Sequence, residues 1–147
     1  SQGGRAKAHV RVVILDASVL VACLFKDGRA RDVLLHALEV QFAAPPGVLE
    51  EAEAQLSHVA RRVHLPEMDV RAVLRELASR VKVVPLETLR LHEARAREVA
   101  KAAGDESDWE YVALALASDA PVWTYDKYFR WMKGIALIST SAVLGRG

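Results

Sequence analysis

The sequence has little cysteine and no long apolar run. Cys23 is its only cysteine, which excludes an internal disulfide and argues against a thiolate zinc site. The longest apolar runs, at residues 12–15 and 19–25, are far shorter than the about 18 residues that a membrane-spanning helix requires. We therefore expect no membrane segment. A single thiol also suits the reducing cytoplasm, where we expect the protein to act.

The sequence also carries little net charge. The formal charge is only +1, so overall charge neither indicates nor excludes a polyanionic partner. Basic residues gather locally, at positions 29 and 31, at 61 and 62, and between 127 and 133. Solvated helix faces are the simpler explanation of these groups. A positive stripe that binds nucleic acid is the alternative.

Several catalytic signatures are absent. The five histidines form no His-Glu-x-x-His motif, so zinc hydrolysis is not indicated. There is no Gly-x-Ser-x-Gly elbow, P-loop or dinucleotide fingerprint. Haloacid-dehalogenase-type phosphatases need a second aspartate where this chain has Ser18, and receiver domains need an aspartate where it has Pro85. Phosphotransfer proteins of similar shape are therefore disfavoured.

Strand-like and helix-like patterns alternate along the chain. We expect a flexible tail at residues 1–10 and a single domain at residues 11–147. Strands are expected at residues 11–16, 40–44, 81–84, 122–124 and 135–138. Helices are expected at residues 17–25, 30–38, 48–63, 68–80, 86–103 and from 108 to about 117. This order predicts an α/β three-layer sandwich, in which helices flank a small parallel sheet of about five strands.

Acidic residues stand where the predicted strands end or the predicted helices begin. They are Asp16, Glu51, Asp108 and Asp126. Each has a structural explanation when taken singly: a helix cap for Asp16, a turn for Asp126 and a solvated face for Glu51. Ser107 and Glu110 have capping-box spacing, which would leave Asp108 favouring the helix dipole.

Taken together, these acids are better explained as a site. In a parallel sheet the carboxyl ends of the strands meet at one edge, so we expect Asp16 and Asp126 to lie close together. Clustered carboxylates repel unless a cation neutralises them. Oxygen ligands without paired histidine or cysteine suit Mg²⁺ or Mn²⁺. Phosphodiester hydrolysis is the chemistry that such a centre serves best.

The acids also stand in recognisable local motifs. These are Leu15-Asp16-Ala-Ser18, Leu49-Glu50-Glu51-Ala, Asp108 at the start of an alanine-rich helix, and Thr124-Tyr-Asp126-Lys127. With them, the chain resembles the PIN-domain family of nucleases, which includes the toxins of VapBC toxin–antitoxin pairs. The resemblance extends over residues 12–139. Its strongest element is Asp108, followed eighteen positions later by the aspartate of Thr-x-Asp.

The resemblance implies roles for individual residues. The family's metal-binding catalytic acids correspond to Asp16, Glu51, Asp108 and Asp126, with Mg²⁺ or Mn²⁺ as cofactor. Its hydroxyl residues near the metal correspond to Ser18 and Thr124, and we expect Ser18, Thr124 and Lys127 to contact the substrate. Asp105 is a further candidate, either as a ligand through water or as a helix cap. Glu50 adjoins Glu51, and we favour Glu51 because Leu49 and Ala52 flank the pair on the apolar face.

The resemblance also implies an activity. We expect a metal-dependent endoribonuclease that cleaves single-stranded RNA, either as a toxin with an antitoxin partner or as an autonomous RNA-processing enzyme. The alternative is a non-catalytic PIN scaffold that binds RNA or protein. We expect a homodimer, with residues 57–86 contributing to partner contacts or specificity. Aromatic residues beside the acids would either pack in the core or stack on unpaired bases; they are Trp109, Tyr125, Tyr128 and Trp131.

Overall fold

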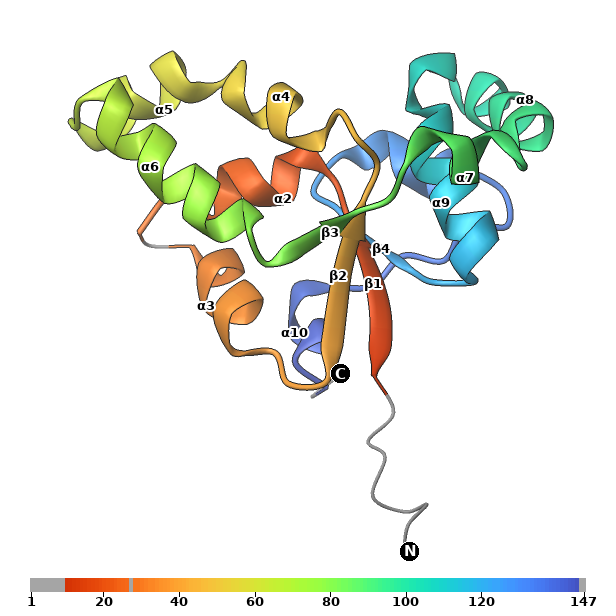
Figure 1. The fold of residues 1–147 in the computed structure, drawn as a ribbon, viewed down its shortest axis with the longest axis horizontal. Coiled ribbons are helices and arrows are strands. Elements are labelled where there is room, and N and C mark those ends of the chain that lie inside the picture. The colour runs from red at the N-terminus through yellow and green to blue at the C-terminus, as the bar shows by residue number, and fades with distance from the viewer. Residues whose placement is uncertain (1–9, 27, 146–147) are drawn as a thin grey trace, which may run out of the picture.

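The computed structural model describes residues 10–26 and 28–145, and these form an α/β fold of three layers (Figure 1). Except for Val10, the expected tail at residues 1–10 lies outside the described residues. The central layer is a parallel sheet with strand order β3-β2-β1-β4. The strands are β1 (Arg11–Leu15), β2 (Val40–Ala44), β3 (Val81–Val83) and β4 (Val122–Trp123).

Strand β1 lies inside the sheet, between β2 and β4. Its residues alternate between the two faces, as a strand that is covered on both sides requires. Val13 and Leu15 belong to one hydrophobic cluster, whereas Ile14 belongs to the other. All three side chains are fully buried, which explains the unbroken apolar run that predicted this strand.

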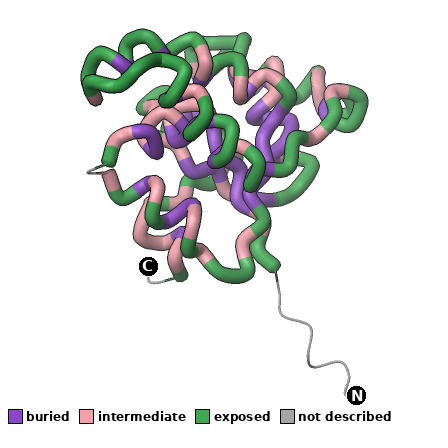
Figure 2. Tube along the Cα trace, turned by 60° about the vertical axis from the view of Figure 1, so that its left-hand side comes forward, coloured by how far each residue is buried: buried purple, intermediate pink, exposed green. Residues whose placement is uncertain are grey.

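The helices of the first outer layer pack on the cluster that contains Val13 and Leu15. They are α2 (Ala17–Ala22), α3 (Arg29–His36), α4 (Val48–Glu53), α5 (Leu56–Val63), α6 (Glu67–Ala78) and α10 (Thr140–Val143). Figure 2 shows the buried segments at the centre of the molecule and the exposed turns around them. The apolar spacing that predicted these helices matches the faces that they bury.

The second outer layer covers the opposite face of the sheet, around Ile14 and Val122. It contains the α-helices α7 (Leu86–Arg90), α8 (Glu93–Ala103) and α9 (Trp109–Ser118), with the 3₁₀ turns η1 (Glu106–Asp108) and η2 (Lys127–Trp131). Helix α9 is buried nearly all round, as its apolar composition predicts. Among the described residues, no helix combines the length and apolar character needed to cross a membrane.

The predicted fifth strand, at residues 135–138, is wrong. The described part of the chain forms four strands, and this segment makes only an isolated parallel bridge between Leu137 and Val122. Strand β4 has just two residues, so it offers little length for a further strand to pair with. Ser139 then caps α10 through a bond from the Ala142 N–H to its hydroxyl, which ends the extended segment.

Two of the predicted long helices are each divided in two. The helix expected at residues 48–63 breaks after Glu53, where the Gln55 N–H donates to the Ala52 carbonyl and tightens the turn. The helix expected at residues 86–103 breaks at residues 91–92, where the His92 N–H similarly donates to Leu89. Neither break contains glycine or proline, so the residue types at these positions gave no signal that the helix would end there. The predicted cap at Gly104 is confirmed by its left-handed φ of +113°.

The register of the sheet brings two sequence-distant segments level with each other. Leu15 pairs with Trp123, so the next residues, Asp16 and Thr124, leave the sheet side by side. Both β1 and β4 end at this edge because the two strands are parallel. The carboxyl edge of the sheet is therefore where the candidate site forms.

Candidate active site

Asp16 is the buried acid of the site, with 5% of its surface exposed. Its Oδ1 accepts a 2.6 Å hydrogen bond from the Ser18 hydroxyl, and its Oδ2 accepts a 2.7 Å bond from the Thr124 hydroxyl. Burial raises the pKa of Asp16, these two bonds lower it, and the nearby charge of Asp126 raises it. Asp16 is also the N-cap residue of α2, but its side chain makes no cap hydrogen bond as short as those from the two hydroxyls.

Two hydroxyl side chains connect Asp16 to the segment that follows β4. The Tyr125 N–H donates to the Ser18 hydroxyl over 3.0 Å, and the Asp126 N–H donates to the Thr124 hydroxyl over 2.9 Å. Each hydroxyl therefore accepts a hydrogen bond from a backbone N–H of the segment after β4 and donates a hydrogen bond to Asp16. This arrangement fixes the position of Asp126 relative to Asp16.

Asp126 opens η2. Its Oδ1 accepts a 3.0 Å hydrogen bond from the Tyr128 N–H, which confirms that this residue initiates a turn. The side chain is half-buried and also lines a hollow that contains Asp16. The turn and the site are therefore compatible functions of one carboxylate.

Glu51 reaches the site from α4. Its Oε1 accepts a 2.8 Å hydrogen bond from the Tyr111 hydroxyl of α9, so helices from both outer layers meet here. Burial is the main cause that raises the pKa of Tyr111, and its bond to Glu51 adds to the effect. Glu51 lines the same hollow, whereas Glu50 does not. The structure therefore places the favoured residue of the pair toward the other acids.

Asp108 stands at the start of α9 and is half-buried. Burial and the charges of four acids, Asp105, Asp126, Glu51 and Asp16 in decreasing order, raise its pKa to about 7. Three of those acids are the other members of the predicted cluster, and like charges nearby disfavour ionisation of Asp108. The capping box predicted for Ser107 and Glu110 does not form, because Ser107 bonds to Asp105 instead and Asp108 is the N-cap.

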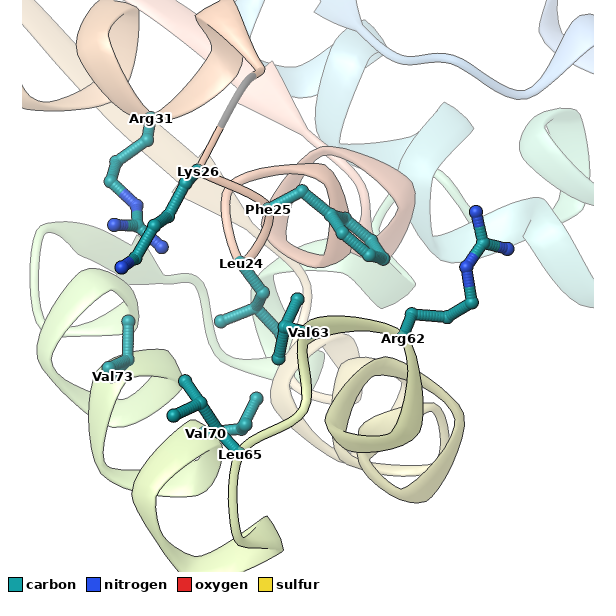
Figure 3. Close-up of a pocket in the computed structure, with 9 residues that line it drawn as sticks. All are labelled: Leu24, Phe25, Lys26, Arg31, Arg62, Val63, Leu65, Val70 and Val73. Carbon is teal, nitrogen blue, oxygen red and sulfur yellow. The ribbon is translucent and has the colours of Figure 1, made fainter.

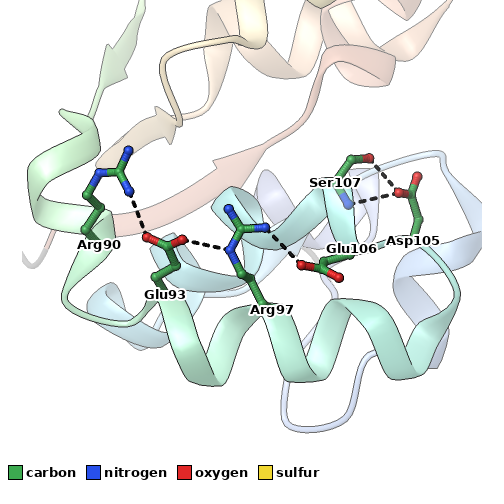
Figure 4. Close-up of polar contacts among 6 residues, drawn as sticks. All are labelled: Arg90, Glu93, Arg97, Asp105, Glu106 and Ser107. Carbon is green, nitrogen blue, oxygen red and sulfur yellow. Dashed lines mark hydrogen bonds and ion pairs between the residues drawn. The ribbon is translucent and has the colours of Figure 1, made fainter.

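A polar network holds the segment that carries Asp108 (Figure 4). Arg97 of α8 donates to Glu93 over 2.7 Å and to Glu106 over 3.0 Å, and its guanidinium lies 4.7 Å from the Trp109 ring centroid. The Asp105 carboxylate caps η1 by accepting from the Ser107 N–H and hydroxyl, and these bonds lower the pKa of Asp105. Asp105 does not line the hollow of the other acids, so the observed role of this residue is the cap.

The four acids converge on one hollow of about 380 Å³, which we call the acidic hollow. Its lining includes Asp16, Ser18, Glu51, Asp108 and Asp126. Within residues 10–26 and 28–145, no group of three or more His, Cys, Asp or Glu side chains is already arranged to hold a metal ion. The donors nevertheless fit a hard divalent ion, because they are carboxylates with no imidazole or thiolate beside them. Burial and then the neighbouring carboxylates raise the pKa of Asp108, and a bound cation would favour its ionised form against both.

Comparison with known proteins identifies the fold family. Residues 14–144 match the family model of the PIN domain. The chain belongs to the PIN-domain family. The resemblance inferred from the sequence motifs is thereby confirmed, and the match spans nearly all of the described residues.

Solved structures share the fold of this PIN domain. PAE2754 from Pyrobaculum aerophilum is 24% identical, with a TM-score of 0.64 over 95% of this chain and 90% of that chain. VapBC2 from Rickettsia felis, bound to a DNA fragment from its promoter, is 17% identical, with a TM-score of 0.66 over 87% and 98%. VapBC-1 from nontypeable Haemophilus influenzae is 16% identical, with a TM-score of 0.57 over 88% and 98%. No curated protein sequence matches significantly.

A second hollow of this PIN domain, which we call the apolar hollow, has a different character (Figure 3). It measures about 490 Å³ and lies between the segment that follows α2 and the helices α5 and α6. Its apolar lining is Leu24, Phe25, Val63, Leu65, Val70 and Val73. Three cations, Lys26, Arg31 and Arg62, complete it. Its apolar residues and cations together suit the binding of a partner segment.

The aromatic residues near the acids divide into two groups. Trp109 is buried, which confirms the packing interpretation for that residue. Tyr125, Tyr128 and Trp131 are instead exposed, so packing in the core does not explain them. They line a third hollow, of about 660 Å³, together with Asp126, Lys127 and Arg130. Lys127 is thus next to the acidic hollow and not in it.

Sequence reasoning missed two residues of the acidic hollow. Tyr111 donates to Glu51, and Gln55 contributes to the lining. Helical spacing gave a usable signal for Tyr111, which follows Asp108 by three residues, a separation that places side chains on one helix face. Gln55 lies beyond the end of α4, so helical spacing from Glu51 gave no signal for it.

Proposed function

We propose that this protein is a metal-dependent endoribonuclease that hydrolyses phosphodiester bonds in single-stranded RNA. The observation that carries the proposal is the convergence of Asp16, Glu51, Asp108 and Asp126 on one hollow at the carboxyl edge of the sheet. These residues come from segments separated by up to 110 positions, and the fold brings them together. Membership of the PIN-domain family supports a nuclease over other phosphate chemistries.

The cofactor that fits this site is Mg²⁺ or Mn²⁺, held by the four carboxylates. Such an ion supplies Lewis acidity, which lowers the pKa of an attacking water and offsets charge on the phosphate. The protein's own groups set the geometry. Ser18 and Thr124 each orient one oxygen of Asp16, while Tyr111 orients Glu51. Side chains held in this way need little reorganisation when the substrate binds.

The setting of the acidic hollow favours a single strand as substrate. Three exposed aromatic rings stand in the adjoining hollow, where an unpaired base has a free face to offer. Lys127 lies in the same adjoining hollow and is exposed, so it is available to a phosphate oxygen of the bound strand. We assign Lys127 to substrate binding.

The test is cleavage of end-labelled single-stranded RNA by the purified protein, with Mg²⁺ or Mn²⁺ and separately with EDTA. Asp16→Asn should abolish cleavage, and Asp69→Asn should not, since Asp69 is an exposed acid of α6 outside the acidic hollow. Double-stranded RNA and single-stranded DNA are tested in the same way as alternative substrates. Cleavage that survives EDTA or Asp16→Asn would refute the proposal. RNA binding with no cleavage under any condition would favour a non-catalytic scaffold.

We also propose an antitoxin protein as partner, with the enzyme acting as the toxin of a pair. Two of the structural relatives are VapBC proteins, and the apolar hollow offers a surface for a partner segment. An amphipathic helix with acidic flanks fits it best, because the apolar lining would bury the helix face and the cations would pair with the acids. A small gene directly upstream should encode such a segment.

A binding experiment with the upstream protein tests this assignment. Val73→Asp would place a like charge against the partner's acids and should weaken binding, while Met68→Asp on the same helix should not. If both variants bind the upstream protein equally well, the partner binds another surface and not the apolar hollow. The homodimer stays a prediction, which sedimentation velocity would check.

A further inference from the structure

The exposed aromatic rings of this chain are gathered in one short segment. The chain has nine aromatic residues, three each of Phe, Trp and Tyr. Among the described residues, the aromatic side chains with large exposure are those of Tyr125, Tyr128 and Trp131, at 48%, 60% and 62%. A protein that buries Trp109 and Trp123 almost completely has therefore left a tyrosine and a tryptophan of η2 uncovered, beside its acidic hollow.

The geometry of η2 explains how these rings come to face outward. In a 3₁₀ turn, side chains three residues apart lie above one another. Tyr128 and Trp131 share the outer side, while Phe129 and the following Met132 are buried at 1% and 3% exposure. Phe129 and Met132 pack in the hydrophobic core and hold η2 in place, so the exposed rings of Tyr128 and Trp131 have fixed positions.

Cations accompany the rings at the same spacing. Lys127 and Arg130 are three residues apart and both exposed, and the Arg130 Nε–H donates to the Lys127 carbonyl over 3.2 Å. The Arg130 guanidinium lies 5.8 Å from the Trp131 ring centroid. Within residues 10–26 and 28–145, neither cation forms an ion pair with a carboxylate. Both charges are therefore available to a phosphate group.

The third hollow, lined by these rings and cations, adjoins the acidic hollow. The two share Asp126, which opens η2 and faces the other acids. Tyr125 lines the third hollow, and its hydroxyl is 2.7 Å from the Thr140 hydroxyl while its ring forms a T-shaped pair with the Trp123 ring. A strand whose phosphate enters the acidic hollow must place its neighbouring nucleotide close by. The third hollow, at about 660 Å³, is large enough for that nucleotide.

We propose that Tyr128 and Trp131 form a stacking site for an unpaired nucleobase next to the phosphate that is cut, with Lys127 and Arg130 holding the adjoining phosphate. Aromatic rings stack on any base, so this site selects for an unpaired strand and discriminates weakly among sequences. Exposed rings with arginine also occur in protein interfaces. The third hollow is continuous with the acidic hollow, and this favours RNA over a protein partner as its ligand. This inference deepens the proposed function and rests on it for the position of the cut phosphate.

RNA binding in EDTA tests the stacking site without requiring cleavage. The probe is a fluorescein-labelled pool of short single-stranded RNA with random sequence, followed by anisotropy. Trp131→Ala and Tyr128→Ala should each weaken binding by about 5- to 150-fold, the usual effect of losing one stacked ring. Trp131→Phe should keep most of the affinity. Leu91→Ala is the matched control, because Leu91 is 81% exposed and lies outside the three hollows described above.

Intrinsic fluorescence provides a second readout. Trp131 is the exposed tryptophan, whereas Trp109 and Trp123 are buried, so RNA should quench wild-type emission and leave Trp131→Phe emission largely unchanged. Unchanged affinity in Trp131→Ala and Tyr128→Ala, with RNA still cut, would overturn the stacking site and leave the proposed function standing. Weaker RNA binding by the two alanine variants, with no RNA cut by the wild type, would support the stacking site and overturn the proposed function. Unchanged RNA affinity with a lost dimer in Trp131→Ala would make the surface a protein interface and overturn the inference.

Discussion

Thr124 donates a 2.7 Å hydrogen bond to Asp16 across 108 positions of sequence. The same hydroxyl accepts from the Asp126 N–H, so one side chain fixes two of the proposed metal-binding acids. Adjacent parallel strands make this possible, because β1 and β4 end level with each other. The hydroxyl residue of the Thr-x-Asp motif is therefore explained by geometry as well as by family resemblance.

Replacement of Thr124 tests its positioning role. Thr124→Val keeps the shape but removes the hydroxyl, and it should lower stability by about 1–3 kcal/mol because a buried oxygen of Asp16 loses its donor. Cleavage should fall by about 10- to 100-fold, as is usual when a partner of a metal ligand is removed. Thr124→Ser keeps the hydroxyl and should therefore retain most of the stability and most of the cleavage activity. Full activity in the valine variant would show that Asp16 is held by other groups.

The raised pKa of Asp108 predicts how stability depends on pH. Its value in the folded protein is about 7, against 3.8 ordinarily, so between these values the folded state retains a proton that the unfolded chain has released. The metal-free protein should therefore lose stability as pH rises from about 4 to about 7. Asp16 contributes in the same direction. Asp108→Asn removes the titrating group, so its stability relative to wild type should improve over this range.

Urea unfolding of both proteins in EDTA across this pH range measures the effect. Parallel stability profiles would contradict the raised pKa of Asp108. Saturating Mg²⁺ should reduce the difference between pH 4 and pH 7 in the wild type, since a bound cation favours the ionised form of Asp108 against both its burial and the neighbouring carboxylates.

Arg97 should support the site indirectly. It joins Glu93 to Glu106 and lies over Trp109, so it steadies the turn from which Asp108 projects. Arg97→Gln should lower the midpoint of urea unfolding slightly, because exposed ion pairs contribute little. It should reduce cleavage less than Asp108→Asn does. Arg95→Gln on the same helix is the control, and equal effects of the two changes would show that the network does not position Asp108.

Cys23 should be unreactive in the folded protein. It is fully buried, and burial raises the pKa of its thiol to about 12, so almost no thiolate is present at neutral pH. A chromogenic disulfide reagent should react with it only after denaturant is added. Rapid stoichiometric reaction of the native protein would mean that α2 opens readily.

Much of the fold could be predicted because local patterns agreed with burial. The run at residues 12–15 is apolar because β1 is covered on both faces, and α9 is apolar because it packs on the sheet. The breaks near Gln55 and Leu91 could not be predicted, since each is a tightened backbone turn that no glycine or proline marks. The predicted strand at residues 135–138 failed because its partner, β4, is too short.

The candidate site was predictable at its acids and less so around them. Asp16 and Asp126 could be placed because parallel strands end at one edge. The bond from Tyr111 to Glu51 joins two outer layers, and no local pattern encodes that meeting. The exposure of Tyr128 and Trp131 likewise depends on how η2 sits on the core through Phe129.

Mn²⁺ binding is the most direct test of the acidic hollow as a metal centre. Electron paramagnetic resonance of free Mn²⁺ gives the affinity for the wild type, Asp16→Asn, Asp108→Asn and the control Asp69→Asn. We predict that the wild type and Asp69→Asn bind equally well, and that each site variant binds at least about tenfold more weakly. Binding that is unchanged in both Asp16→Asn and Asp108→Asn would contradict the proposal that these carboxylates hold the catalytic ion.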